Sequence, residues 1–379
     1  MEFSFSEDQD ELRRSARRFL EVESSEERVR TAMESERGYE KATWEQLSEE
    51  LAWTALTIPE QYGGLGMSYL DLHPLMEEMG RALLCSPFFS TICLGANVIL
   101  LGGSEAQKEA HLPGMAAGET TATLAFGEKN ARMNAEGIET SYTKTGDGFI
   151  LNGEKSYVVD GHNSDLLVVA ARLGGSKGAE GVSLFLVPSG TKGVKQTWLP
   201  TMDQTRRLGE IELANVHVLG EALLGPEGRG WALCERTLDL ARIALAAEQV
   251  GAAEMCLEMS VEYAKVRKQF GRSIGSFQAI KHKCADMLMM VESARSAAFY
   301  ASALASQGDE SLAEAASSAK AICSDTFFHC AAENIQIHGG IGFTWEHAAH
   351  MYFKRAKSTE TLLGDPSFHR ERVAQHMGL

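Results

Sequence analysis

The sequence lacks the features that mark several classes of protein. None of its seven cysteines forms a C-x-x-C pair, and their odd number and scattered spacing argue against a disulfide scaffold or a zinc module. No apolar run approaches the roughly 18 residues that a membrane-spanning helix needs. The first residues show neither the basic segment nor the apolar core of a signal peptide. We therefore expect a cytoplasmic protein in a reducing compartment.

Basic residues are also in deficit. Acidic residues outnumber them by 52 to 36, which gives a formal net charge of -16 and a pI of about 5.2. A surface this acidic repels phosphate backbones and anionic lipid headgroups, so we expect no nucleic-acid partner and no membrane association. An anionic small ligand is still compatible with the sequence, because a few local arginines can hold one against the overall field.

The chain has 379 residues, of which 44% are hydrophobic and 23% are charged, so it can form two or three globular units. Helical patterns fill roughly the first 120 residues, strand-like patterns follow, and helical periodicity returns after the glycine-proline segment at 225–228. Because helices and strands stay in separate runs, we predict a mainly α protein with a central all-β domain. The predicted domains are an N-terminal helical domain (1–120), a middle β domain (121–225) and a C-terminal helical bundle (226–379).

Local signals refine this prediction. Three sequences match the capping box of a helix N-terminus, and two glycine-containing turns bracket a short apolar segment as in a β-hairpin. We expect strands at 166–171, 182–187 and 210–218, long helices at 231–268, 277–305 and 311–337, and short helices after Trp345 and Pro366. The capping boxes are Ser6-x-x-Gln9, Thr43-x-x-Gln46 and Ser311-x-x-Glu314, and the turns are Gly146-Asp147-Gly148 and Asn152-Gly153.

Two motifs in the C-terminal part carry the chemistry. In the first, Arg267-Lys268-Gln269-Phe270-Gly271 ends one helix and Phe277-Gln278 opens the next. This set suits a diphosphate clamp, since arginine offers paired donors to phosphate oxygens, but a basic residue at a helix C-terminus also compensates the helix dipole. In the second, the glycine turn of Gln336 to Thr344 is either a helix cap or a place of close backbone approach to a ligand.

A metal site is a weaker hypothesis. Glu346, His347 and His350 follow the glycine turn and could share one helical face. No further strong ligand accompanies them, so we do not expect a metal centre here.

Together with the helical, β and helical order, these motifs resemble the acyl-CoA dehydrogenase family over essentially the whole chain. Four segments match family patterns, and the last two are specific as a pair. They are the opening Phe3-Ser4-Phe5-Ser6-Glu7-Asp8-Gln9, the Pro59 to Gly66 loop, Arg267 to Gly271 with Phe277-Gln278, and Gln336 to Thr344.

The resemblance implies a helical N-terminal domain, a β-barrel-like middle domain and a C-terminal four-helix bundle, with FAD between the last two. It also implies that the far end of FAD reaches a neighbouring subunit, so that a dimer or tetramer completes the site. Backbone amides of Phe126 and Gly127 are further candidates for the flavin side. The implied cofactor residues of the C-terminal part are Arg267, Gln269, Phe270 and Gln278, with Gln336, Gly339 and Gly340 at the adenine end of the partner's FAD.

The implied reaction is α,β-dehydrogenation of an acyl-CoA thioester. A carboxylate removes the α-proton, a hydride passes to the flavin, and hydrogen-bond donors polarise the carbonyl on which charge develops. Asp239 and Arg242 fall where the family contacts acyl-CoA, although Arg242 could instead form an ordinary ion pair on its helix. A soluble electron-transfer flavoprotein is the expected electron acceptor.

The sequence departs from the family at its catalytic positions. Leu363 stands at the usual glutamate, and Ala241 stands at the alternative base position on the long helix. Val159 replaces the hydroxyl residue expected near the flavin. Asp365 and Glu360 are candidates for a displaced base, yet Asp365-Pro366 is also typical of a helix N-cap, and Glu360 of a solvated helix residue.

Several functions remain open from these residues. The first hypothesis is an FAD-dependent acyl-CoA dehydrogenase of fatty-acid or steroid side-chain oxidation, acting alone or as one subunit of a heteromer. Bacterial relatives of the steroid type include heteromers in which only one chain supplies the base. The alternatives are a non-catalytic partner that completes the FAD site of another chain, or another flavin oxidation on the same fold, such as nitroalkane oxidation or hydroxylation.

Overall fold

The structure is a computed structural model that describes residues 5–379, so Phe3 and Ser4 of the opening motif lie outside the described residues. The chain forms two compact units. We call residues 5–31, 68–84 and 242–379 the helical unit, and residues 32–67 and 85–241 the sheet unit. The predicted boundaries near 120 and 225 stay a prediction, because the two units follow packing and not the order of the sequence.

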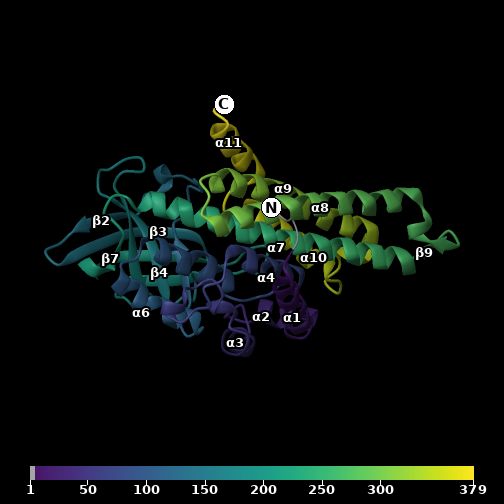
Figure 1. Cartoon of the computed structure of the whole chain (residues 1–379), viewed down its shortest axis with the longest axis horizontal. Coiled ribbons are helices and arrows are strands. Elements are labelled where there is room, and N and C mark those ends of the chain that lie inside the picture. Colours follow the sequence, from purple (N-terminus) through teal and green to yellow (C-terminus); the bar gives the residue numbers. More distant parts are fainter. Residues whose placement is uncertain (1–4) are drawn as a thin grey trace. The chain divides into compact units, whose positions relative to one another are not determined.

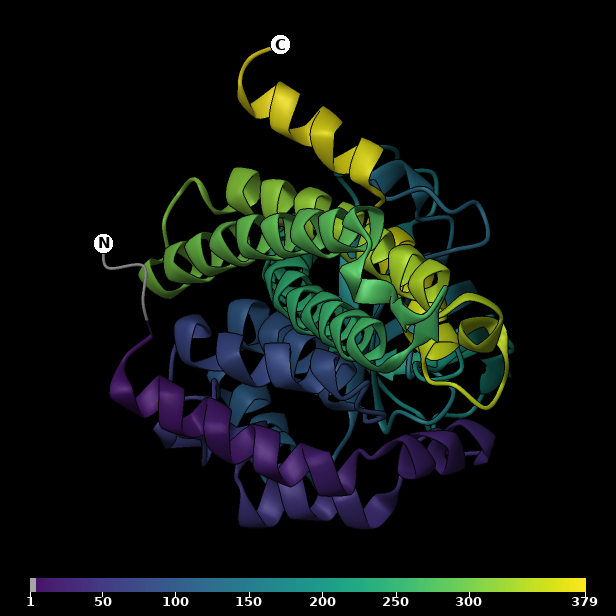
Figure 2. The ribbon, with the colours of Figure 1, turned by 90° about the vertical axis from the view of Figure 1, so that its right-hand side faces the viewer.

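Three long helices dominate the helical unit. Helix α7 (Gly230–Val266) enters this unit at Arg242, and a short hairpin of β9 (Lys268–Gln269) and β10 (Arg272–Ser273) connects it to α8 (Gln278–Gln307). Helix α9 (Leu312–His338) returns beside α8, as Figures 1 and 2 show. The three predicted long helices are therefore confirmed. The other helices of this unit are α1 (Glu7–Glu23), the start of α2 (Glu26–Glu34), α4 (Tyr69–Arg81), α10 (Ala349–Thr361) and α11 (Pro366–His376).

A buried charge network fixes α1 against α4. The Glu77 carboxylate is fully buried and lies 2.7 Å from Arg13 and 2.6 Å from Arg295. Glu78 accepts two hydrogen bonds from Arg17 at 2.9 and 2.7 Å. Burial opposes the ionised form of Glu77, but His73 and the two arginines outweigh it and lower its pKa to about 2. Glu77 and Glu78 therefore have a structural role, as partners of buried ion pairs.

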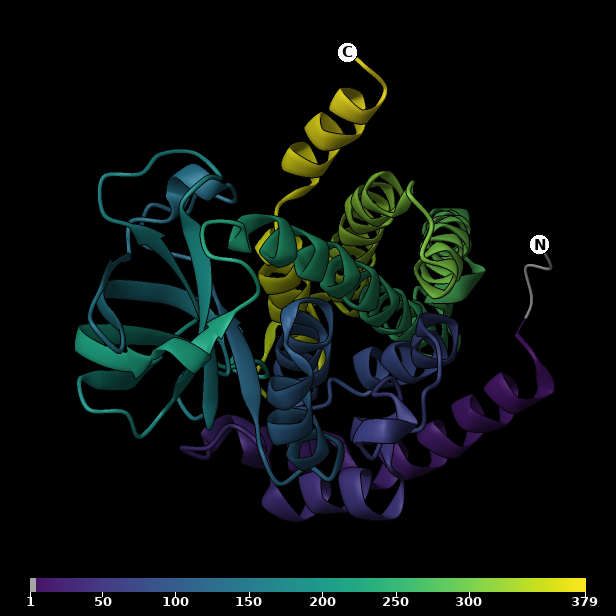
Figure 3. The same ribbon diagram turned by 60° about the vertical axis from the view of Figure 1, so that its left-hand side comes forward.

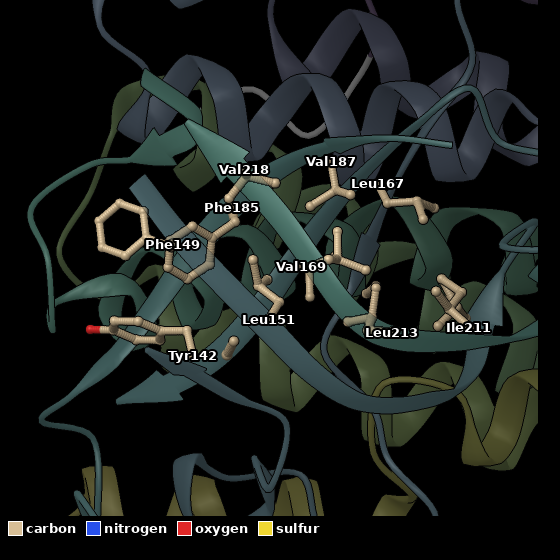
Figure 4. Packing of buried hydrophobic residues seen from close by; sticks show 14 residues of the cluster. Tyr142, Phe149, Leu151, Leu167, Val169, Phe185, Val187, Ile211, Leu213 and Val218 are labelled. Carbon is tan, nitrogen blue, oxygen red and sulfur yellow. The ribbon is translucent and has the colours of Figure 1, made fainter. Parts of the chain in front are cut away.

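The sheet unit contains one mixed eight-stranded sheet, whose strands are visible in Figure 3. Its order is β6-β7-β3-β2-β4-β5-β8, with β1 beside β4, and β4 is parallel to β1 and β2. Alternating apolar residues fill one side of the sheet, where the Tyr142 ring packs edge to face with Phe149 and Phe185 (Figure 4). The strands are β1 (Ala122–Ala125), β2 (Ser141–Lys144), β3 (Gly148–Val159), β4 (Leu166–Leu173), β5 (Val182–Pro188), β6 (Val194–Leu199), β7 (Leu208–Leu219) and β8 (Leu223–Leu224).

Apart from the first part of α7, the α-helices that lie wholly in the sheet unit precede its strands. They are α3 (Lys41–Glu45), α5 (Asn97–Gly102) and α6 (Glu105–Ala116), with the π-helical turns Gln46–Glu50 and Phe89–Ala96 between them. The succession of helical, β and helical segments along the chain confirms the predicted fold class.

Some local predictions are corrected by the structure. The turn at Gly146 to Gly148 connects β2 and β3, but Asn152-Gly153 is no turn, because β3 continues through it with a register shift against β7. The capping box at Ser6 is confirmed. Thr43 instead lies inside α3, whose N-cap is Glu40. Ser311 does occupy an N-cap, but its hydroxyl donates to Asp309 and does not cap the helix.

Candidate active site

The residue at the position of the expected base lies in a strained, buried turn. We call residues 360–364 the Leu363 turn. Helix α10 ends at Thr361, and Leu363 then adopts φ +62°, a left-handed conformation that costs an ordinary residue on the order of 1–3 kcal/mol. Its side chain is 3% exposed. Gly364 follows with φ +106°, and a Cβ there would lie 2.5 Å from the Phe368 ring. The surroundings therefore impose this conformation.

Three buried side chains donate hydrogen bonds to the Leu363 turn. Arg242 Nε lies 3.0 Å and His369 Nε2 lies 3.1 Å from the Leu363 carbonyl oxygen, which thereby uses both lone pairs. Lys320 Nζ lies 3.2 Å from the carbonyl oxygens of both Glu360 and Gly364. All three donors are almost fully buried. The turn is therefore saturated with donors from α7, α9 and α11.

The electrostatics of this cluster disfavour further positive charge. Burial and the neighbouring Arg242 and Lys320 lower the pKa of His369 to about 2, so its imidazole is neutral near pH 7. A carbonyl oxygen can only accept, so the His369 proton sits on Nε2, and the buried Nδ1 makes no hydrogen bond. Burial and Arg242 also lower the pKa of Lys320 to about 7.

Both candidate carboxylates have other partners. Asp365 is exposed and caps α11, accepting a hydrogen bond from the Phe368 amide at 2.7 Å, and Pro366 occupies the first turn. Glu360 lies 2.6 Å from Lys357 in an ion pair. Catalysis by either residue stays a prediction, and so does acyl-CoA contact by the buried Asp239.

The arginine motif forms an exposed hairpin between α7 and α8. Phe270 stands at its tip with φ +53° and 90% of its surface exposed, an unusual environment for a large apolar ring. The Arg267 side chain is exposed as well and has no hydrogen-bond or ion-pair partner within residues 5–379. Gln269 and Gln278 are likewise exposed. The Gln278 amide lies 3.4 Å from the His282 ring, and the other groups remain accessible to a ligand or another chain.

The glycine turn (Gly339–Phe343) lies beside the base of that hairpin. The Tyr263 ring near the end of α7 stacks on His338 at the end of α9, with 4.2 Å between ring centroids. Gly339 has φ +64°, and no heavy atom lies within 4 Å of the place where a Cβ of Gly339 or Gly340 would stand. Gln336 is exposed. The backbone here leaves an open cradle, which fits the close approach of a flat or phosphorylated group.

In the sheet unit, a buried ion pair fixes the loop of Phe126 and Gly127. Lys155 Nζ lies 2.6 Å from the Glu128 carboxylate and 3.3 Å from the Phe126 carbonyl oxygen. The Ser156 amide donates to the Gly127 carbonyl oxygen at 2.9 Å, while the buried Ser156 hydroxyl has no partner in the described chain. The loop is therefore fixed by these contacts, and the Ser156 hydroxyl next to it is left without a hydrogen-bond partner in the described chain.

A β-bulge next to this loop re-aims Tyr157. The pairing of β3 with β7 shifts between Lys155 and Val158, and Tyr157 adopts φ +60° with half of its surface exposed. Val159, by contrast, is buried. Tyr157 is thus presented to solvent, whereas Val159, at the position of the missing hydroxyl, is apolar and buried.

Sequence reasoning missed Lys320 and His369. A signal for Lys320 was present, since a lone lysine interrupts the small and apolar residues from Ala315 to Cys323 on a helix that must be buried. His369 gave no such signal. No three His, Cys, Asp or Glu side chains of residues 5–379 are arranged to hold a metal ion. None of the helices in the described chain is both long and apolar enough to span a membrane.

Comparison with known proteins establishes the class. Three family models match consecutive parts of the chain: acyl-CoA dehydrogenase, N-terminal domain (6–119), middle domain (123–216) and C-terminal domain (228–378). The chain belongs to the acyl-CoA dehydrogenase family and is an oxidoreductase of that class.

Individual relatives cover nearly the whole chain. Acyl-CoA dehydrogenase IpdE2 of Mycolicibacterium smegmatis is 34% identical over 95% of this chain and 96% of its own. The structure of butyryl-CoA dehydrogenase from Megasphaera elsdenii superposes with a TM-score of 0.92, at 31% identity and full coverage of both chains. The ChsE4-ChsE5 complex from Mycobacterium tuberculosis gives a TM-score of 0.90, with 25% identity over 100% of this chain and 99% of that one.

Proposed function

We propose that this chain is one subunit of a heteromeric, FAD-dependent acyl-CoA dehydrogenase in which a partner chain supplies the catalytic carboxylate. The chain contributes cofactor-binding residues and the flavin environment, and the partner removes the α-proton. The acyl group and the soluble electron-transfer flavoprotein as acceptor stay predictions.

The observation that carries this proposal is the state of the two base positions. Leu363 and Ala241 are both apolar and buried, so neither can accept a proton. Asp365 is committed to the N-terminus of α11, and Glu360 is paired with Lys357. A carboxylate that must reach a substrate within about 0.5 Å of the productive geometry is therefore better sought on another chain.

The free groups of the chain support the cofactor part of the proposal. Arg267 would hold the FAD diphosphate, Gln269 and Phe270 would flank it, and Gln336, Gly339 and Gly340 would line the adenine end of the partner's cofactor. The fit rests on the unpaired Arg267 guanidinium, the exposed Phe270 ring and the open cradle at Gly339. FAD, when bound, supplies the acceptor for the hydride.

Similarity to the ChsE4-ChsE5 complex favours a heteromer, because that structure is a complex of two differently named chains. Arg242 was expected from the sequence to contact acyl-CoA, but in this proposal it acts mainly on the backbone of the Leu363 turn. Its Nε is already bonded to the Leu363 carbonyl oxygen, so its first role is to hold the turn.

The proposal is tested by purifying the chain alone and co-expressed with the product of a neighbouring gene. We expect flavin absorbance in the co-purified complex, bleaching of that absorbance by an acyl-CoA, and no bleaching by this chain alone. Sedimentation with detection in the flavin band assigns the colour to an oligomer. A colourless monomer that gains no FAD from solution or from a partner chain would contradict the proposal.

Substitution of Asp365 distinguishes an enzyme whose partner chain supplies the base from one in which Asp365 is the base. Asp365→Asn in the complex should change the rate of flavin bleaching by less than about twofold, because the base lies elsewhere. If Asp365 is the base, the same substitution should slow bleaching by about 10²–10⁴-fold while FAD and acyl-CoA still bind. Rapid-mixing absorbance spectroscopy measures the rate.

A further inference from the structure

The Leu363 turn is held more firmly than an inactive segment requires. Four hydrogen bonds from three buried donors converge on the carbonyl oxygens of residues 360, 363 and 364. Strained left-handed residues persist only where their surroundings over-determine them, and they concentrate at functional sites. Here the over-determined residue is a leucine that can do no acid–base chemistry.

We call the side chains of Arg242, Lys320 and His369, which bind the Leu363 turn, the frame. None of their hydrogen bonds to the turn involves the side chain at position 363. Arg242 and His369 hold the backbone oxygen of that residue, and Lys320 holds the oxygens on either side of it. Ser324 anchors Lys320 in turn, at 2.8 Å from Nζ. A different side chain at 363 would therefore leave from the same backbone position and in the same direction.

The surroundings would also favour an ionised carboxylate at this position. Arg242 and Lys320 are buried, and the hydrogen bonds from Lys320 go to the Ser324 hydroxyl and two backbone oxygens, so no carboxylate in the cluster is hydrogen-bonded to Lys320. Nearby positive charge stabilises the charged form of an acid. Because His369 is neutral, it adds a donor to the frame without adding another charge.

We propose that Lys320 and His369 are positioning residues which, with Arg242, preserve in this chain a working frame for a catalytic base at position 363, so that Leu363→Glu alone confers proton abstraction. The proposal rests on the proposed function for its flavin and acyl-CoA. It assigns to this chain a latent activity that its present sequence does not express.

The experiment uses the flavin-loaded complex, assembled with a partner whose own base has been removed by a Glu→Gln substitution. With butyryl-CoA and octanoyl-CoA as probes, Leu363→Glu should bleach flavin at least about 100-fold faster than the matched Leu363→Gln control, the scale of a positioned base. Adding Lys320→Met or His369→Leu should abolish most of that gain. His369→Gln, which keeps a neutral donor, should retain it.

A second measurement tests the frame without any turnover. Amide hydrogen exchange of residues 360–364 in the otherwise unmodified chain should accelerate at least tenfold in Lys320→Met and in His369→Leu. Lys283→Met, which removes a lysine paired with Glu333 elsewhere in the bundle, should leave it unchanged. Exchange at the wild-type rate in both frame variants would overturn the proposal.

The outcomes distinguish this inference from the proposed function. Loss of flavin, or the absence of any spectral response to acyl-CoA in the unmodified complex, counts against the proposed function, and the exchange data still decide whether the two side chains hold the turn. A complex that binds acyl-CoA while Leu363→Glu bleaches no faster than Leu363→Gln overturns the inference alone. So does a gain that survives both frame substitutions.

Discussion

Two turns of the helical unit both contain residues with positive φ, but they differ in what their surroundings do. At the Leu363 turn, residues 363 and 364 have positive φ, and buried donors of the same chain bind three of its carbonyl oxygens. At the glycine turn, Gly339 also has positive φ, but the space around it is open and Phe343 is largely exposed. The first turn is complete within one chain. The second turn exposes its backbone and the Phe343 ring to solvent, as expected where a ligand or another subunit binds.

The largest expected contrast concerns the dependence of stability on pH at the Leu363 turn. The folded pKa of Lys320, about 7, lies below its ordinary value of 10.5, so between these values the unfolded chain binds a proton that the folded chain does not. The free energy of unfolding should therefore gain up to about 1.4 kcal/mol per pH unit from this residue as pH rises through that window. Below pH 7 this contribution levels off at its least favourable value.

Lys320→Met should remove that contribution. Urea unfolding of wild type and variant at pH 7, 8 and 9 measures the difference between their free energies of unfolding, from which the titration of other groups cancels. Lys283→Met serves as the control and should follow the wild type. A constant difference between wild type and Lys320→Met across the three pH values would contradict the pKa shift.

A substitution in the exposed hairpin between α7 and α8 should change the affinity for FAD and leave the stability of the chain nearly unchanged. Arg267→Ala should weaken FAD binding by about 1.5–3 kcal/mol, the value of a hydrogen bond to a charged group. The stability of the FAD-free chain should change by less than about 0.5 kcal/mol, since the side chain is exposed and unpaired. Flavin titration and thermal unfolding report the two quantities. A stability loss equal to the loss in affinity would show that the region is not preformed.

The smallest effect separates two adjacent glycines. Gly339→Ala should destabilise the FAD-free chain by about 1–3 kcal/mol, because φ +64° with ψ -141° is a backbone conformation that residues with a Cβ adopt only under strain, even where space is open. Gly340→Ala has neither strain nor a clash and should cost less than about 0.5 kcal/mol. Denaturant unfolding of the pair measures the difference. Equal costs would mean that the glycine turn is conformationally free before ligand binding.

The sequence predicted the helical, β and helical order and the three long helices, because these depend on periodicity over many residues. The Asn152-Gly153 prediction failed because the same dipeptide serves in a bulge when the strand pairs on through it, and pairing with β7 is a long-range property. The capping prediction at Thr43 failed because Glu40, a weaker capping residue, begins the helix.

The candidate site was predictable only as a set of positions. Comparison of motifs located Leu363, and of the two interpretations of Asp365-Pro366 the N-cap followed by proline is confirmed, while a catalytic role of Asp365 stays a prediction. It could not locate the donors on the Leu363 turn, because Arg242 and Lys320 lie 121 and 44 residues away from the oxygens that they bind, and the hydrogen bond of His369 back to the turn depends on how α11 packs after it. Which oxygens they bind is decided by tertiary packing alone.

The composition of the helical unit from three separate stretches of chain has a consequence for synthesis on the ribosome. Helices α1 and α4 carry Arg13 and Glu77, yet Arg295, which completes their buried charge network, lies in the last stretch. At about 5–20 residues per second, the early helices wait on the order of ten seconds or more before that stretch emerges. During this interval the whole sheet unit is made, so we expect it to fold first while the amphipathic faces of α1 and α4 remain uncovered and available to chaperones.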